Sequence, residues 1–174
     1  MTAVLCVLTL GMAAVASGAT KQQTMPDWQD PQVVQKNRAP MTATFETDGL
    51  KTILNGVWNF KWYETIDSRS KDFYSLSYDD SSWNTMPVPG VWELNGYGHP
   101  LYKNVGYAWF GHYKNNPPFP CMEHNYAGQY RRTFPLGSEW AGKDVFLHIG
   151  SATSNVRVWV NGKAVGYSDD SKLE

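Results

Sequence analysis

The sequence predicts an all-β protein, a β-sandwich or jelly roll, and three observations lead to this fold class. Residues 57–63 (VWNFKWY) alternate between two faces, with three aromatic residues on one of them, as in a half-buried strand. The stretch NVRVWVNGKAVGYS contains two alternating runs joined by Asn161 and Gly162, a dipeptide that favours a type I′ hairpin turn. No stretch of useful length has a helical period. We therefore expect antiparallel strands around a shared core.

The first 19 residues predict a signal peptide. Residues 3–16 are apolar or small, and two small-x-small cleavage sites are present, at 14–16 and 17–19. The apolar run is short for a membrane span, and no basic residue precedes Lys21. We expect a periplasmic or secreted protein, and a cytoplasmic one if this leader is not functional.

Residues 20–50 predict an extended arm on the surface of the domain proper, which spans 51–174. Prolines interrupt this stretch three times and no period is sustained. Trp28, Val33 and Val34 are the expected anchors of the arm.

The remaining elements follow in order. Residues 64–85 predict an irregular crossing with a short helical turn, and 86–90 (MPVPG) a short edge strand, because proline cannot donate to a ladder. Strands are expected at 128–136 and at 144–150 (DVFLHIG). The second is apolar on both faces and is therefore expected to be central. The chain stops just after the hairpin at 156–167 without a closing strand, which predicts a domain incomplete at its C-terminus.

Composition narrows the class of partner. The net charge is −1 and no basic stripe exists, so neither nucleic acid nor a membrane is expected as a partner. Aromatic residues reach 14%, with eight Trp and ten Tyr, and such rings fill cores or stack on the apolar face of a sugar.

Catalytic motifs are absent from the sequence. It contains no P-loop, GxSxG, HExxH or CxxC pattern. Its glutamates do not follow strands in a βα pattern, where a barrel enzyme would place a catalytic pair. We therefore assign no catalytic residue to this chain.

The loop at 95–120 allows two interpretations. Its many Gly, Pro and aromatic residues suit a stiff structural loop. Asn104 offers one acceptor and two donors beside aromatic surface, which also suits the wall of a sugar site. The residues alone favour neither interpretation.

Acidic residues suggest one candidate cation site. Asp27 and Asp30, three apart in the arm, could join Asp169 around a hard cation, which prefers oxygen ligands. The alternative is that these residues only form turns.

Six motifs follow one another in fixed order over about residues 25–174. They are DWQDPQVVQKNR, LNGVWNFKW, VPGVWELNGYGHPLYKNVGY, NPPFP, GQYRRTF and VWVNGKAVGYSDDSKLE. In this order they resemble the N-terminal part of the glycoside hydrolase family 2 β-galactosidases. The resemblance implies a jelly-roll sugar-binding domain that precedes immunoglobulin-like domains and a TIM barrel. The barrel carries the two catalytic glutamates, so the present chain alone is expected to be inactive.

The resemblance also implies roles for particular residues. Asn104, in YKNVGY, matches the asparagine that reaches into the barrel and binds galactose hydroxyls. The arm matches a segment that supports subunit assembly and contributes to a secondary magnesium site. Asp27, Asp30 and the carbonyl of Val33 match ligand positions of that site, and Asp169 stands where the well-studied type has Gln. The ligands of the catalytic magnesium and sodium ions are expected only in the full-length enzyme.

The expected function is therefore that of the N-terminal domain of a β-galactosidase, which hydrolyses terminal non-reducing β-D-galactosides. The domain is expected to complete the sugar pocket and to support assembly. Its expected partners are the remaining domains of the same polypeptide and further copies in a homo-oligomer. The alternative is a free-standing carbohydrate-binding module without catalytic activity.

Overall fold

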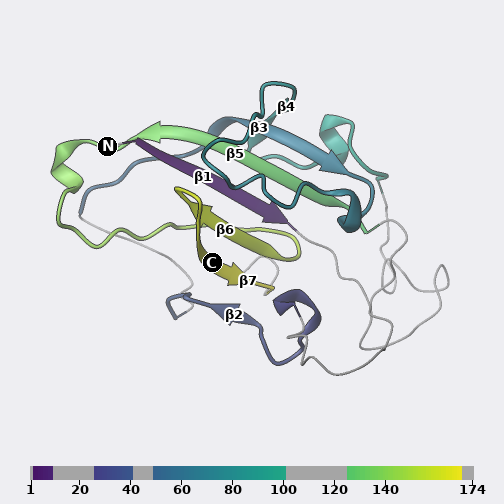
Figure 1. Ribbon diagram of the computed structural model, residues 1–174, viewed down its shortest axis with the longest axis horizontal. Helices are drawn as coiled ribbons and strands as arrows, with labels where there is room; N and C mark the ends of the chain where they lie inside the picture. The colour runs from purple at the N-terminus through teal and green to yellow at the C-terminus, as the bar shows by residue number, and fades with distance from the viewer. Residues whose placement is uncertain (1, 10–25, 41–48, 101–124, 170–174) are drawn as a thin grey trace.

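The computed structural model describes residues 2–9, 26–40, 49–100 and 125–169, and confirms the all-β class (Figure 1). Seven strands form one antiparallel sheet in the order β2-β7-β6-β1-β5-β3-β4. No helix in these ranges is long and apolar enough to span a membrane. The strands are β1 (Thr2–Thr9), β2 (Gln35–Lys36), β3 (Gly56–Tyr63), β4 (Asn84–Val88), β5 (Ala127–Pro135), β6 (Val156–Val160) and β7 (Lys163–Ser168). The single-turn 3₁₀ helices are η1 (Asp27–Gln29), η2 (Ile66–Ser68), η3 (Glu93–Asn95) and η4 (Ser138–Trp140).

The strands with clear alternation lie where the sequence predicts them. In β3, Trp58 and Phe60 are buried while their neighbours Val57 and Asn59 are exposed. The proline-punctuated β4 is an edge strand of the sheet, as expected. Between β3 and β4 the chain makes an irregular crossing that contains η2, which also agrees with the prediction.

The hairpin of β6 and β7 has the turn that its sequence predicts. Asn161 and Gly162 adopt φ values of 51° and 80°. Both values lie in the left-handed region, which a type I′ turn requires at its two central residues. Asparagine and glycine tolerate that region best, so these two residues suit the turn that joins β6 to β7.

Two clusters of buried residues lie on opposite faces of the sheet. One contains Trp58, Val156 and Val158. The other joins strand residues to the crossing and to the arm, and consists of Trp28, Ile66, Phe73, Ala127, Trp159 and Tyr167. Because the arm contributes Trp28, it is part of the domain core and not only a surface segment.

Two expectations about individual segments are wrong. Residues 144–149 form no strand, although their sequence predicts a central one. The position between β5 and β6 is taken by β1, which pairs with both strands. Val34 is not an anchor of the arm, since it is 47% exposed. Export through a cleaved leader stays a prediction.

Candidate functional site

The arm is held against the edge of the sheet by backbone pairing. β2 adds to β7, with Gln35 opposite Ser168 and Lys36 opposite Tyr167. The pairing continues beyond the strand, where the amide of Asp169 donates to the carbonyl of Val34 at 3.1 Å. The arm therefore lies directly beside Asp169, as the resemblance implies.

Asp27 connects the arm to the sheet by charge. One of its carboxylate oxygens lies 2.6 Å from Lys36 Nζ, and the other lies 2.7 Å from an Arg157 guanidinium nitrogen. Arg157 also lies over the ring of Tyr167, 5.3 Å from its centroid. Partly buried pairs of this kind orient the arm more than they stabilise it, because the gain is offset by lost hydration.

These contacts bear on the predicted magnesium site of Asp27, Asp30, Val33 and Asp169. Both carboxylate oxygens of Asp27 already contact cations, and Asp30 accepts a hydrogen bond from the amide of Gln32 at 3.0 Å. Within the ranges described, no three His, Cys, Asp or Glu side chains are grouped closely enough to hold a metal ion. As they lie, these residues do not fit a magnesium ion, and its binding stays a prediction.

Tyr167 lies under the arm and is almost wholly buried. Burial raises the pKa of its hydroxyl to about 12, and the negative charges of Asp169 and Asp27 add to the effect. The hydroxyl is therefore neutral at physiological pH and accepts a hydrogen bond from the Asn155 amide at 2.7 Å.

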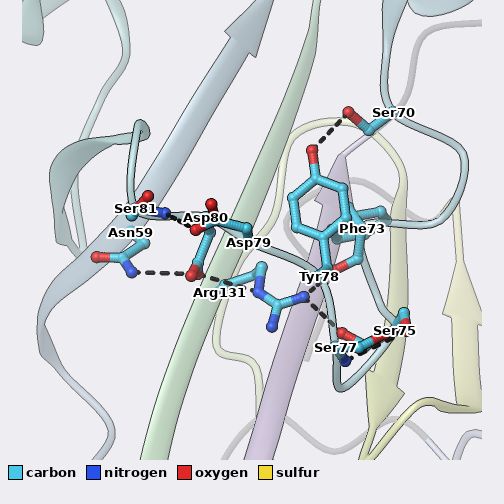
Figure 2. Close-up of polar contacts among 10 residues, drawn as sticks. All are labelled: Asn59, Ser70, Phe73, Ser75, Ser77, Tyr78, Asp79, Asp80, Ser81 and Arg131. Carbon is cyan, nitrogen blue, oxygen red and sulfur yellow. Dashed lines mark hydrogen bonds and ion pairs between the residues drawn. The ribbon is translucent and has the colours of Figure 1, made fainter.

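A second structural unit is the crossing between β3 and β4, which two side chains of β5 hold in place. Gln129 donates to the carbonyl of Ser70 at 2.6 Å. Arg131 donates to the carbonyls of Phe73 and Ser75, the latter at 2.9 Å, and to the Asp80 carboxylate at 3.0 Å. Figure 2 shows the Arg131 side chain reaching from its strand into the crossing.

Further polar contacts complete this unit. Asp80 also accepts a hydrogen bond from Asn59 on β3, at 3.1 Å, and Arg131 lies over the Tyr78 ring. A deeply buried arginine needs acceptors for its donors, and the crossing supplies two carbonyls and one carboxylate. Arg131 therefore fixes the irregular crossing to the sheet together with Gln129.

The arm, the crossing and β6 together line a half-open cavity of about 350 Å³. That volume lies within the usual range for small-molecule sites. Trp159 forms part of its apolar wall, and the Tyr74 ring is stacked on it. The two ring centroids are 5.3 Å apart and the angle between the ring planes is 3°. The aromatic lining residues are Trp28, Phe73, Tyr74 and Trp159.

Three cations line the same cavity: Arg69, Lys71 and Arg157. Arg157 is paired with Asp27, whereas neither Arg69 nor Lys71 has a carboxylate partner in the described part of the chain. Burial lowers the pKa of Arg69, the nearby Asp67 carboxylate acts in the opposite direction, and the positive charge of Arg157 makes a smaller lowering contribution. The Nε of Arg157 is buried without a hydrogen-bond partner among the described residues. The cavity thus combines aromatic surface with excess positive charge.

Asn104 lies outside the described residues, but both flanks of its loop are defined. On its N-terminal side, Trp92 donates to the Tyr130 hydroxyl, and Tyr97, at the start of the loop, meets Phe60 edge-on with ring centroids 4.9 Å apart. After it, Tyr126 packs against Trp62 at 5.0 Å. The chain therefore leaves and re-enters the described structure over one aromatic surface of β3 and β5.

The sequence interpretation missed Arg131, Gln129 and the cavity cations. Two consecutive arginines in a predicted strand, at 131 and 132, were the available signal, because a charged side chain on the buried face of a strand needs a specific partner. The partners are mostly backbone carbonyls of an irregular segment, which no sequence pattern marks.

Comparisons with known proteins agree with this fold. Residues 51–174 match the family model described as glycosyl hydrolases family 2, sugar binding domain. The chain is 35% identical over 161 residues to a β-galactosidase of Priestia megaterium, a match covering 84% of this chain and 16% of that protein. It is 33% identical over 165 residues to a β-galactosidase large subunit of Leuconostoc lactis, a match covering 82% of this chain and 26% of that protein. A Streptococcus thermophilus β-galactosidase is 37% identical to the chain over 122 residues, which are 70% of this chain and 12% of that protein. The chain thus spans about a quarter or less of the length of these curated relatives.

Proposed function

Because this chain belongs to glycosyl hydrolase family 2, whose sugar-binding domain it carries, we propose that it is the N-terminal domain of a β-galactosidase. The observation that carries the proposal is the family match over residues 51–174, together with relatives that are named as β-galactosidases. The domain would position the loop at 95–120 beside a catalytic barrel supplied by the rest of the polypeptide. The proposed substrates are terminal β-D-galactosides.

The described residues fit a domain that positions the substrate while another part of the polypeptide carries out catalysis. Retaining hydrolysis needs two carboxyl groups about 5–5.5 Å apart, one acting as acid and base and one as nucleophile. Among the described carboxylates, Asp79 accepts from the amide of Ser81, Asp80 is paired with Arg131, and Glu93 lies in the single-turn helix η3. We therefore place catalysis outside this chain and substrate positioning within it.

The complete polypeptide containing this domain should hydrolyse a chromogenic β-galactoside, and the present chain alone should not. In the complete enzyme, Asn104→Ala should weaken inhibition by galactose about five-fold for each hydrogen bond of ~1 kcal/mol that is lost. Inhibition constants at several substrate concentrations measure this effect. Asn115→Ala, in the same loop sequence, is the control. Saturable turnover by the chain alone, or an Asn104→Ala enzyme with unchanged galactose inhibition, would contradict the proposal.

A second candidate function is direct binding of an acidic sugar unit in the cavity between arm, crossing and β6. Its aromatic wall suits the apolar face of a sugar ring, and its two cations without carboxylate partners suit a carboxylate substituent. This activity would belong to a carbohydrate-binding module and needs no catalytic residue.

Titration calorimetry with galacturonate and galactose tests this candidate. The acidic sugar should bind the domain more tightly than the neutral one. Lys71→Gln should remove about 1 kcal/mol of that preference, roughly a five-fold loss, because Lys71 is exposed at the cavity rim. Lys61→Gln, on β3 and outside the cavity lining, should have no effect. Equal affinities for both sugars would rule out this candidate.

A further inference from the structure

β1 occupies a position in the middle of the sheet, far from its partners in sequence. Its residues Thr2–Thr9 pair with β5 on one side, and Leu5–Thr9 pair with β6 on the other. Both ladders are antiparallel, so β5 and β6 run parallel to each other with one strand position between them. Figure 1 shows β1 lying between these two strands.

The chain that joins β5 to β6 contains an unused apolar segment. Residues 144–149 (DVFLHI) form no strand, and Val145, Phe146 and Leu147 are 54%, 69% and 39% exposed. Three consecutive exposed apolar residues lose the free energy that their burial would provide. Figure 1 shows this connection leaving the end of β5 and running back to the start of β6.

The position between β5 and β6 fits this segment topologically. A strand that follows β5 and precedes β6 would run antiparallel to both, as β1 does. The connection needs only two reversals, for which residues 136–143 and 150–155 are available. Strands that are consecutive in sequence usually neighbour each other in a sheet, and such meanders close with little loop entropy.

One end of the segment already packs against the core of the sheet. Ile149 packs against the core cluster that contains Val156 and Val158 of β6. Movement into the sheet would therefore extend an existing contact. If β1 left and nothing replaced it, β5 and β6 would each expose a row of unpaired backbone groups, which is unfavourable.

We propose that β1 and residues 144–149 are alternative occupants of the strand position between β5 and β6. β1 holds the position in the structure described, and 144–149 enters it when β1 is displaced or removed. The exchange restores the backbone ladders and buries Val145, Phe146 and Leu147. Because residues 1–19 also form the predicted signal peptide, the exchange keeps the sheet continuous between β5 and β6 with or without them.

Proline substitutions in the full chain test the exchange. Val7 has a strand on each side, opposite Tyr130 and Val158, so Val7→Pro removes a ladder hydrogen bond and disfavours β1. Hydrogen exchange of the amides at 144–149 should then become at least about ten-fold slower, since these amides join a ladder. Ala16→Pro, outside β1, should leave their exchange unchanged.

A double-mutant cycle provides the second readout. Leu147→Pro alone should shift the Tm very little, because residues 144–149 form no strand while β1 is in place. Val7→Pro with Leu147→Pro should lower the Tm by more than the sum of the single effects, since neither segment can then fill the position. Additive effects, or unchanged exchange at 144–149 in Val7→Pro, would overturn the proposal.

Discussion

Replacing Arg131 with methionine is expected to lower the free energy of unfolding by about 3–5 kcal/mol, the usual cost of removing one partner of a buried ion pair. Arg131 is only 6% exposed and donates to Asp80 and to the carbonyls of Phe73 and Ser75. Methionine fills similar space but leaves these acceptors without their donor. Urea unfolding followed by tryptophan fluorescence measures the loss.

Two further variants identify the cause of the stability loss in Arg131→Met. Lys61→Met, on the neighbouring strand β3, removes a cation that has no partner in the described part of the chain, and should change stability by less than about 0.5 kcal/mol. Asp80→Asn in the Arg131→Met background should recover part of the loss, because it removes the charge left unpaired. If Arg131→Met costs no more than Lys61→Met, the arginine does not hold the crossing in place.

Gly128→Ala is expected to cost about 1–3 kcal/mol through overpacking. A Cβ at this position of β5 would lie 2.3 Å from Cζ2 of Trp92 and 2.9 Å from Cε2 of Phe60. Phe60 is fully buried and cannot yield, so Trp92 must move. Because Trp92 precedes the loop that carries Asn104, the complete enzyme should also bind galactose more weakly.

Gly166→Ala, on β7, is the matched control for this substitution. Its new Cβ would lie 3.8 Å from the carbonyl oxygen of Lys36, an ordinary contact, so stability should be unchanged or slightly higher. Thermal unfolding of the chain and galactose inhibition of the complete enzyme measure the two effects. A Gly128→Ala protein as stable as Gly166→Ala would show that Trp92 is not tightly placed over β5.

Local patterns were sufficient to predict several strands. β3 and β5 have alternating side chains, and the hairpin of β6 and β7 has the turn residues Asn161-Gly162. These signals are local and do not depend on the surrounding structure. The proline-containing β4 could be placed at an edge for the same reason, since a proline lacks the amide that a neighbouring strand would need.

The candidate sites were less predictable. Trp28 was recognisable as an arm anchor from its size, but Val34, expected to anchor the arm, is largely exposed. Asp27 and Asp30 have spacing that suits a cation, yet Asp27 pairs with Lys36 and Arg157. The spacing of acidic residues in an irregular segment does not determine which charged groups they contact. Folding places cationic side chains from elsewhere in the chain, such as Arg157, beside them.

The all-β class, the hairpin turn and the family could be read from the amino-acid sequence, because they depend on periodicity, turn chemistry and ordered motifs within short stretches. The identity of the apolar segment between β5 and β6, and the role of Arg131 in fixing the crossing, became visible in the folded chain alone. Residues 2–9 and 144–149 are both apolar enough for a central strand, so composition cannot choose between them. The choice depends on which segment completes the two backbone ladders, a property of the assembled sheet.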